Sequence, residues 1–389
     1  MRRFLRAPRD ALQHPVKKIM SSTVPTPASY FSVRYKQGRE KFYAACEQAG
    51  LAVEAHVHPD LKGPEGEDLA VDCAWMGPRD AAKVMMITCG THGLEAAAGS
   101  ATILQWLENK PALPEETAAL IVHAVNPFGW AYASRENEDG IDLNRNCLDH
   151  SGPHPDNPAY DELHALIEGA GVTDEALDEF LARFAQFCAE KAFSYAVSGV
   201  TGGQYAYPEG LSYGGVKLSW SCKTLYKIAR RHLERAEKVF LLDWHTGIGA
   251  YGEPFFILDH EKSSPEHLLA ASWWPSHVIH CGDTIDGVSP DYKGLLTDGL
   301  RREIEPLNGA QVVGLVIEWG TYEVNAMLQA LILDRWLRLN RDEHDRDLVE
   351  DVGRRLVERF YPSAPEWRNS VLMKAEKIYE EAFAGLARW

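Results

Sequence analysis

The stretch that decides the fold is KVMMITCGTHGLE, residues 83–95. Its first seven residues, 83–89, are nearly all apolar and end at Gly90, which is the pattern of a strand buried on both faces of a sheet. The segment from about 95 to 108 is rich in alanine and ends before Pro111, so we expect a helix there. A buried strand followed directly by a helix indicates an α/β fold.

The same alternation recurs along the chain. Further buried strands are predicted at AALIVHAV (118–125), KVFLLDW (238–244), VVGLVIEW (312–319), PFFILD (254–259) and SHVIHC (276–281). Two short apolar runs around the turn LKGPEGED predict a hairpin over 51–77. Helices are expected at 36–49, 158–192 (two helices), 220–235, 323–338 and on to the C-terminus. Together these elements predict an α/β sheet covered by helices on both faces.

Composition excludes several classes of protein. The 389 residues include 40 Lys and Arg against 56 Asp and Glu, a net charge of −16, and 45% are apolar, as in an ordinary globular chain. The negative balance argues against nucleic acid and against an anionic membrane surface as partners. No apolar run approaches the ~18 residues that a membrane span needs. An anionic small substrate stays possible, because a local site can oppose the global charge.

Cysteine usage and the N-terminus bear on the compartment. The seven cysteines are widely spaced without a C-x-x-C pair, which predicts reduced, mostly buried thiols. The basic first twenty residues lack the apolar core of a secretory signal, so we expect a cytoplasmic protein. We expect residues 1–29 to be a disordered tail or a start-site artefact, with a transit peptide as the alternative. Residues 30–389 are expected to form one domain with a helical insertion at about 156–195.

Polar residues gather just past the carboxyl ends of three predicted strands, where open α/β sheets usually bind ligands. His92 and Glu95 follow the first strand three residues apart, so a turn brings both side chains to one face. His245 follows KVFLLDW. Two histidines and one glutamate are the ligand set of a catalytic zinc site that keeps a position for water. Glu318 ends another apolar run, where a carboxylate beside a metal would act as general base.

The loop between these strands reads SRENEDGIDLNRN, residues 134–146. Arg135 is a candidate for stabilising an oxyanion on a metal-bound carbonyl. Arg145 together with Asn144 could clamp a substrate carboxylate.

Four motifs in this order, T-H-G-L-E, the loop 134–146, D-W-H-T-G and V-I-E-W-G, resemble those of the zinc carboxypeptidase (M14 metallopeptidase) superfamily. The sequence is most similar to the DUF2817 branch, which is related to the succinylglutamate desuccinylase and aspartoacylase deacylases. The resemblance covers roughly residues 30–389. It implies a three-layer α/β/α fold with a mixed, mostly parallel central sheet.

The resemblance also implies roles for single residues. His92, Glu95 and His245 match the family's zinc ligands, with one Zn²⁺ per chain. Arg135 matches the arginine that stabilises the oxyanion. Glu318 matches the general base.

The substrate-binding residues follow in the same way. Asn144 and Arg145 match the pair that binds the substrate carboxylate. Tyr292, in SPDYKG, is the best-placed candidate for the family's mobile tyrosine, and Tyr251 is a weaker alternative. Residues 202–215 resemble a loop specific to this branch.

The implied activity is a zinc-dependent hydrolase that uses metal-activated water to cleave an amide bond in a carboxylate-bearing substrate. That substrate is a peptide C-terminus or an N-acyl amino acid. The alternatives are a small-molecule deacylase or esterase on the same site, or a metal- or peptide-binding protein without catalysis. The expected partners therefore include neither nucleic acid nor a membrane, and the sequence does not indicate an oligomeric state.

Structural alternatives exist for individual residues. Arg135 could form a salt bridge with Glu136, Glu138 or Asp139, and Asp243 could orient a zinc-bound histidine or cap a loop. Asp139 and Asp142 are candidate ligands of a second metal. Cys89 could be a nucleophile, although a buried strand residue is expected at this position.

Overall fold

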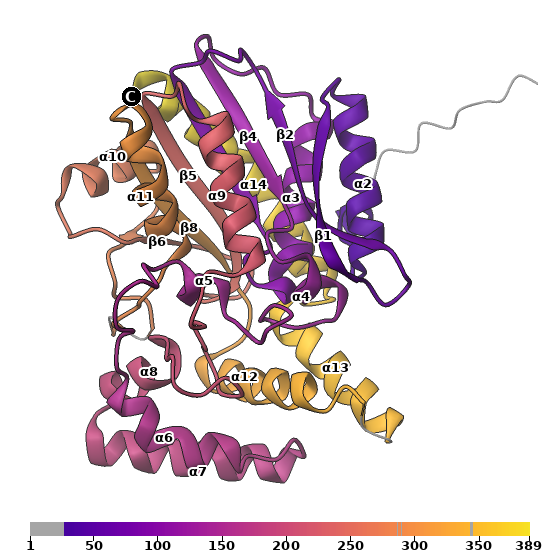
Figure 1. The fold of residues 1–389 in the computed structure, drawn as a ribbon, viewed down its shortest axis with the longest axis vertical. Coiled ribbons are helices and arrows are strands. Elements are labelled where there is room, and N and C mark those ends of the chain that lie inside the picture. Colours follow the sequence, from indigo (N-terminus) through magenta and orange to yellow (C-terminus); the bar gives the residue numbers. More distant parts are fainter. Residues whose placement is uncertain (1–26, 286, 289, 343–344) are drawn as a thin grey trace, which may run out of the picture.

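The computed structural model describes residues 27–285, 287–288, 290–342 and 345–389, and these contain one eight-stranded sheet (Figure 1). The strands are β1 (Val53–Lys62), β2 (Asp68–Met76), β3 (Lys83–Cys89), β4 (Thr117–His123), β5 (Lys238–Gly247), β6 (Pro254–Leu258), β7 (Ile279–His280) and β8 (Gln311–Gly320). Most of the expected tail, residues 1–26, lies outside the described residues. The last three residues of the expected tail, 27–29, belong to the short helix α1 (Pro27–Tyr30).

The strand order is β1-β2-β4-β3-β5-β8-β6-β7. The central strands β4, β3, β5 and β8 are parallel, whereas β1 and β2 form an antiparallel hairpin and β6 runs antiparallel to β8. The sheet is therefore mixed and mostly parallel, which confirms the predicted fold class. Side chains alternate along β3: Met85 and Ile87 pack into one hydrophobic core, and Val84 and Met86 into another.

Helices cover both faces of this sheet, as Figure 1 shows. One face packs against α9 (Trp220–His232) and α11 (Leu296–Asn308). The opposite face packs against α1, α2 (Tyr35–Gln48), α3 (Ala96–Glu108), α10 (Pro265–Trp273) and α14 (Pro365–Arg388). Short helices α4 (Pro127–Ala131) and α5 (Leu143–Asn146) and a 3₁₀ turn, η1 (Gly93–Glu95), lie in the connecting loops.

A third group of helices forms a layer beyond the carboxyl edge of the sheet, at the bottom of Figure 1. It contains α6 (Pro158–Glu168), α7 (Asp174–Lys191), α8 (Phe193–Thr201), α12 (Val324–Leu339) and α13 (Arg346–Phe360), which share a separate hydrophobic core. The first two are the pair of helices predicted for the acidic insertion. The third, α8, is additional and begins after Ala192, whose φ of 92° breaks the helix. Residues of α8 and α12 in this layer line a cavity next to the carboxyl ends of the central strands.

Several elements differ from the sequence predictions. The run SHVIHC forms a strand only over Ile279–His280, because a turn in which His277 N–H donates to the Trp274 carbonyl precedes it. Neither α10 nor α11 was predicted. For α11 the reason is composition, since Gly299 and Pro306 lower its helix propensity.

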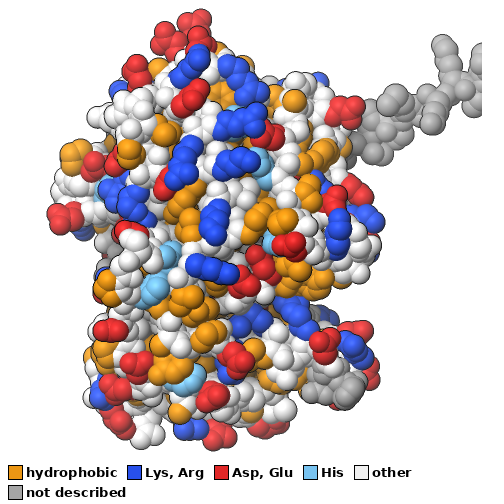
Figure 2. All heavy atoms as spheres, viewed as in Figure 1, with side chains coloured by type: hydrophobic (Ala, Val, Ile, Leu, Met, Phe, Trp, Pro, Cys, Tyr) orange, Lys and Arg blue, Asp and Glu red, His pale blue; other side chains and the backbone are white. Residues whose placement is uncertain are grey.

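The cysteines are reduced and mostly buried, as the sequence predicted. All seven cysteines are free and five of them are buried. Lys and Arg side chains gather on the face over α9 in Figure 2, although the net charge is negative. Within the described ranges, no helix combines the length and apolar character needed to cross a membrane.

His123, at the end of β4, gives the fold a dependence on pH. Its ring is fully buried, stacks on Phe42 with centroids 4.3 Å apart, and contacts Ser100 Oγ at 2.9 Å. Burial, with a smaller effect of Arg39, lowers the pKa of His123 to about 3. The native ring therefore stays neutral where the unfolded ring takes up a proton. Stability is complete above the unfolded pKa of about 6.5 and falls as the pH drops toward 3.

We expect this histidine to cost about 2 kcal/mol of unfolding free energy between pH 7 and pH 5. His123→Phe keeps the stacked ring without the titration, so its stability should vary less with pH than that of the wild type, whatever its absolute stability. Urea unfolding of both proteins at the two pH values measures the difference. Parallel pH dependences would contradict the assignment.

Candidate metal centre

The predicted ligands come together because three adjacent strands are parallel. β3 pairs with β5 and β5 with β8, so their carboxyl ends meet at one edge of the sheet. His245 and Glu318 are register partners on β5 and β8. His92 and Glu95 lie just after β3, on the loop that leads into α3.

The backbone of this loop depends on two glycines. Gly90 has a φ of +71°, which a residue with a side chain rarely adopts. A Cβ on Gly93 would lie 2.0 Å from the Gly129 carbonyl carbon, so the η1 turn packs directly on α4. Gly93 N–H also donates to the Arg135 carbonyl at 3.2 Å. The turn that presents His92 and Glu95 is thus fixed by backbone contacts.

The donor atoms of the three predicted ligands lie within 4.8 Å of one another, and all three residues are buried. Glu95 Oε1 is 2.9 Å from His92 Nδ1, and Glu95 Oε2 is 3.0 Å from His245 Nδ1. In a tetrahedral zinc site, N and O ligands are about 3.3 Å apart. The observed separations are a few tenths of an ångström shorter, so small side-chain movements would admit the ion.

Each imidazole is also held on its other nitrogen by an aspartate. His92 Nε2 is 3.1 Å from Asp142 Oδ1, and His245 Nε2 is 2.7 Å from Asp243 Oδ2. Thr88 and Thr91 donate hydroxyl hydrogen bonds to Asp243. An acid that holds one ring nitrogen and leaves the other for a metal is the usual outer sphere of protein zinc sites. The residues present therefore fit a zinc ion.

The pKa values of Glu95 and His245 are shifted by the close approach of carboxylates and imidazole rings. Burial alone would raise the pKa of Glu95, but the His92 and His245 rings offset it, and the pKa lies below its ordinary range. Burial alone would lower the pKa of His245, but Asp243 and Glu95 raise it well above the ordinary value. The lowered pKa of Glu95 and the raised pKa of His245 both mean that positive charge beside these carboxylates is favourable. A proton on His245 or a metal ion would supply that charge.

Glu318 lies beside this group on β8. It is buried, and Ile248 N–H donates to its Oε2 at 3.4 Å. Burial, and after it the Glu95 carboxylate, raises the pKa of Glu318 to about 7. A carboxylate with a pKa near neutrality is suited to accept and return a proton.

The predicted oxyanion residue, Arg135, is tied to the ligand sphere. Its Nη1 donates to Asp142 Oδ2, so Asp142 bridges Arg135 and His92. Its backbone N–H donates to Asp334 Oδ1 at 2.9 Å. The salt bridge with Glu136, foreseen as a structural alternative, is also present, with Arg135 Nη1 3.7 Å from Glu136 Oε1.

The predicted carboxylate clamp, Asn144 and Arg145, is held by contacts with several parts of the chain. Arg145 donates from Nε to the Thr201 carbonyl at 2.8 Å, and its guanidinium carbon lies 4.7 Å from the centre of the Tyr292 ring. Asn144 Oδ1 accepts a hydrogen bond from Leu296 N–H at 2.9 Å, which orients this side chain. The arginine is thus positioned by backbone and ring contacts before any substrate binds.

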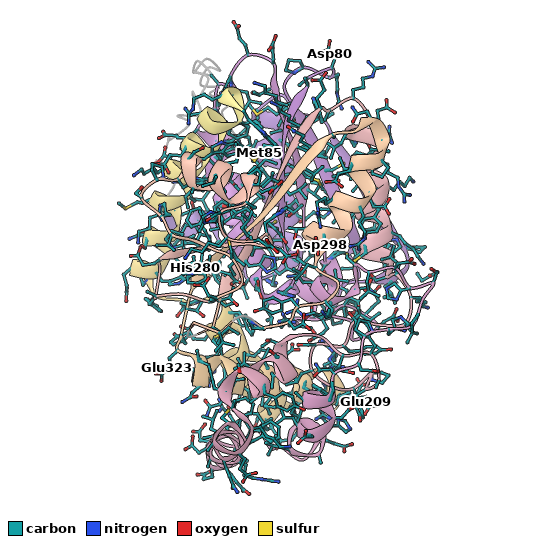
Figure 3. The ribbon with its side chains drawn as sticks, turned by 90° about the vertical axis from the view of Figure 1, so that its left-hand side faces the viewer. Asp80, Met85, Glu209, His280, Asp298 and Glu323 are labelled. Atoms are coloured by element: carbon teal, nitrogen blue, oxygen red, sulfur yellow. The ribbon has the colours of Figure 1, made fainter. Side chains whose placement is uncertain are left out.

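A cavity of about 830 Å³ joins the candidate metal ligands to the clamp. Its lining includes His92, Glu95, Arg135, Asn144, Arg145, Tyr292 and Glu318. Of the two tyrosines considered, Tyr292 lines the cavity, whereas Tyr251 is exposed and lies against Tyr322. In Figure 3, His280 lies on the sheet side and Glu323 on the side of the helical layer, and both line the cavity.

Two features of the site were not assigned from the sequence. Asp142 was considered as a ligand of a second metal, but it holds His92 and Arg135, and Asp139 is exposed. The cavity wall formed by Phe193 on α8 and Leu328 on α12 was not assigned at all. The position of Asp142, two residues before Asn144, was the available signal for its role.

Comparison with known proteins gives one family match. The family described as "Protein of unknown function (DUF2817)" matches residues 31–374, which is most of the chain. No curated protein matches the sequence.

Solved structures of low sequence identity are also similar. Carboxypeptidase A from Helicoverpa armigera has 12% identity and a TM-score of 0.47, over 91% of this chain and 76% of that one. A protein from Shewanella amazonensis SB2B, provisionally named a metallopeptidase, has 16% identity and a TM-score of 0.41, over 80% and 93%. A provisional succinylglutamate desuccinylase/aspartoacylase family protein from the same organism has 18% identity and a TM-score of 0.33, over 74% and 72%.

The aspartate behind His92 provides a test of the metal site. We expect Asp142→Asn to weaken zinc binding by roughly 10–100-fold, because the ring loses the carboxylate that orients it. Competition with a chromophoric chelator measures the affinity. Asp139→Asn, an exposed acid on the same loop, is the matched control and should bind zinc like the wild type. Equal affinities for both variants would remove Asp142 from the outer sphere.

Proposed function

We propose that this chain, which belongs to the DUF2817 family, is a zinc-dependent hydrolase that cleaves an amide bond in a substrate with a free carboxylate. The observation that carries the proposal is that Glu318 lies beside the His92–Glu95–His245 group and lines the same cavity as Arg145. A metal site, a general base and a carboxylate-binding cation in one cavity are the parts that this chemistry needs.

The residues of the chain would divide the reaction among them. Bound to the His92–Glu95–His245 group, zinc supplies a Lewis acid and lowers the pKa of water. Glu318 accepts the proton of the attacking water and returns it to the leaving nitrogen. Arg135 stabilises the oxyanion that develops on the carbonyl. Arg145 binds the substrate carboxylate and so sets which bond faces the base.

The same parts serve a peptide C-terminus and an N-acyl amino acid, because both carry a carboxylate near the scissile amide. Esters require no further residues. The proposal therefore names the bond type and the carboxylate, and includes peptidase, deacylase and esterase variants of one site.

Replacement of the base separates catalysis from metal binding. We expect Glu318→Gln to retain wild-type zinc content and to lose turnover by about 10²–10⁴-fold, the usual contribution of a general base. Glu323→Gln changes another carboxylate that lines the same cavity and should keep near wild-type turnover. Elemental analysis and steady-state kinetics give the two readouts. Near wild-type turnover in Glu318→Gln would remove it from the base role.

A substrate panel tests the proposed chemistry. The zinc-loaded protein should hydrolyse members of a set of C-terminal dipeptides, N-acyl amino acids and their ester analogues, and amidation of the substrate carboxylate should abolish the activity. His245→Ala should lose the zinc of this site and all turnover. Failure to hydrolyse any member of the panel with zinc bound would favour the non-catalytic alternative.

A further inference from the structure

A second group of metal-type donors lies at the far edge of the sheet. Glu54 on β1, Cys73 on β2 and His232 at the end of α9 place one ligand atom each within 4.8 Å of one another. Their nitrogen, sulfur and oxygen donors differ from the two nitrogens and one carboxylate of the candidate metal centre. Thiolate together with imidazole is a donor set that favours zinc among the common divalent ions.

The fold brings these donors together directly. Glu54 and Cys73 are register partners in the β1–β2 hairpin, so their side chains lie on the same face of the sheet. Helix α9 packs on that face, and its residues share a hydrophobic core with Cys73. The His232 ring stacks on Trp75, with centroids 6.1 Å apart and ring planes at 20°, which fixes its orientation.

The distances match the edges of a tetrahedral zinc site. His232 Nε2 lies 3.4 Å from Glu54 Oε2 and 3.9 Å from Cys73 Sγ. Zinc with ordinary bond lengths would set these at about 3.3 Å for the N–O edge and about 3.6 Å for the N–S edge. The ion therefore requires shifts of only a few tenths of an ångström.

The surroundings leave the donor atoms free for an ion. Arg231 donates to Glu54 Oε1 at 2.6 Å, so Oε2 remains directed to His232, and the arginine side chain is 62% exposed. His56 adds a buried Nε2 without a hydrogen-bond partner, 3.2 Å from Glu54 Oε1.

We propose that Glu54, Cys73 and His232 bind a second zinc ion, in addition to the one expected from the sequence. The exposed fraction of the side chains rises from 1% for Cys73 to 31% for Glu54, so the fourth position faces solvent and takes water. Binding displaces the thiol proton of Cys73 to solvent. The ion joins the C-terminal end of α9 to the β1–β2 hairpin and stabilises this edge of the sheet. The site is independent of the proposed hydrolase activity.

Cobalt substitution distinguishes this site from the candidate metal centre. Metal-free protein titrated with Co²⁺ should develop a thiolate-to-cobalt charge-transfer band, because Cys73 would bind the ion. The His92–Glu95–His245 group contains no sulfur and cannot give this band. Cys73→Ser should lose the band and one equivalent of bound zinc. Cys188→Ser and Cys281→Ser, which change partly exposed thiols elsewhere, are matched controls and should keep both. His245→Ala should keep the band and lose only the other equivalent.

His232→Gln provides a second variant at the helix end in case Cys73→Ser folds poorly. Zinc should raise the melting temperature of His245→Ala but not that of the double variant His245→Ala, His232→Gln. The proposal fails if the wild-type protein binds a single equivalent of zinc and shows no charge-transfer band. It also fails if the band persists in both Cys73→Ser and His232→Gln.

Discussion

The structure depends on a balance of buried charge around Glu95. Three acids, Glu95, Asp142 and Asp243, surround two imidazole rings, all of these side chains are buried, and Arg135 is the cation beside them. Three carboxylates and one guanidinium leave two negative charges. Buried charge without a partner costs several kcal/mol, so the arrangement requires compensation. A divalent cation would balance it, and Asp243 and Glu95 raise the pKa of His245, so that a proton on this ring supplies positive charge in the absence of a metal.

The strands that bring these charged residues together could be predicted from the sequence, because each strand has a local apolar pattern. β3, β5 and β8 are runs of apolar residues, and the polar residues at their ends must meet once the strands are parallel. Elements without a clear pattern were missed. α11 contains a glycine and a proline, and β7 is reduced to two residues by the turn before it. Local propensity is a weak guide where tertiary packing decides the conformation.

The candidate site was predictable to the same extent. His92, Glu95, His245 and Glu318 stand at strand ends and follow a recognisable order, and the structure brings them together. Contacts between remote parts of the chain were not predictable. Asp142 reaches His92 across 50 residues, and the wall of the cavity combines α8 with α12, which are more than a hundred residues apart. No periodicity or spacing records such contacts, because they depend on how the helical layer docks below the sheet.

The hydrogen-bond chain from Arg135 through Asp142 to His92 has a thermodynamic consequence. Asp142 shares its negative charge between a guanidinium that faces the cavity and an imidazole that faces the metal position. Anything that draws Arg135 toward itself leaves more of that charge on His92 and makes its ring a stronger donor. Under the proposed function the linkage would be reciprocal: a ligand in the cavity would raise the affinity for the ion by the same factor by which the ion would raise the affinity for the ligand. The protein would release its metal most readily when its cavity is empty.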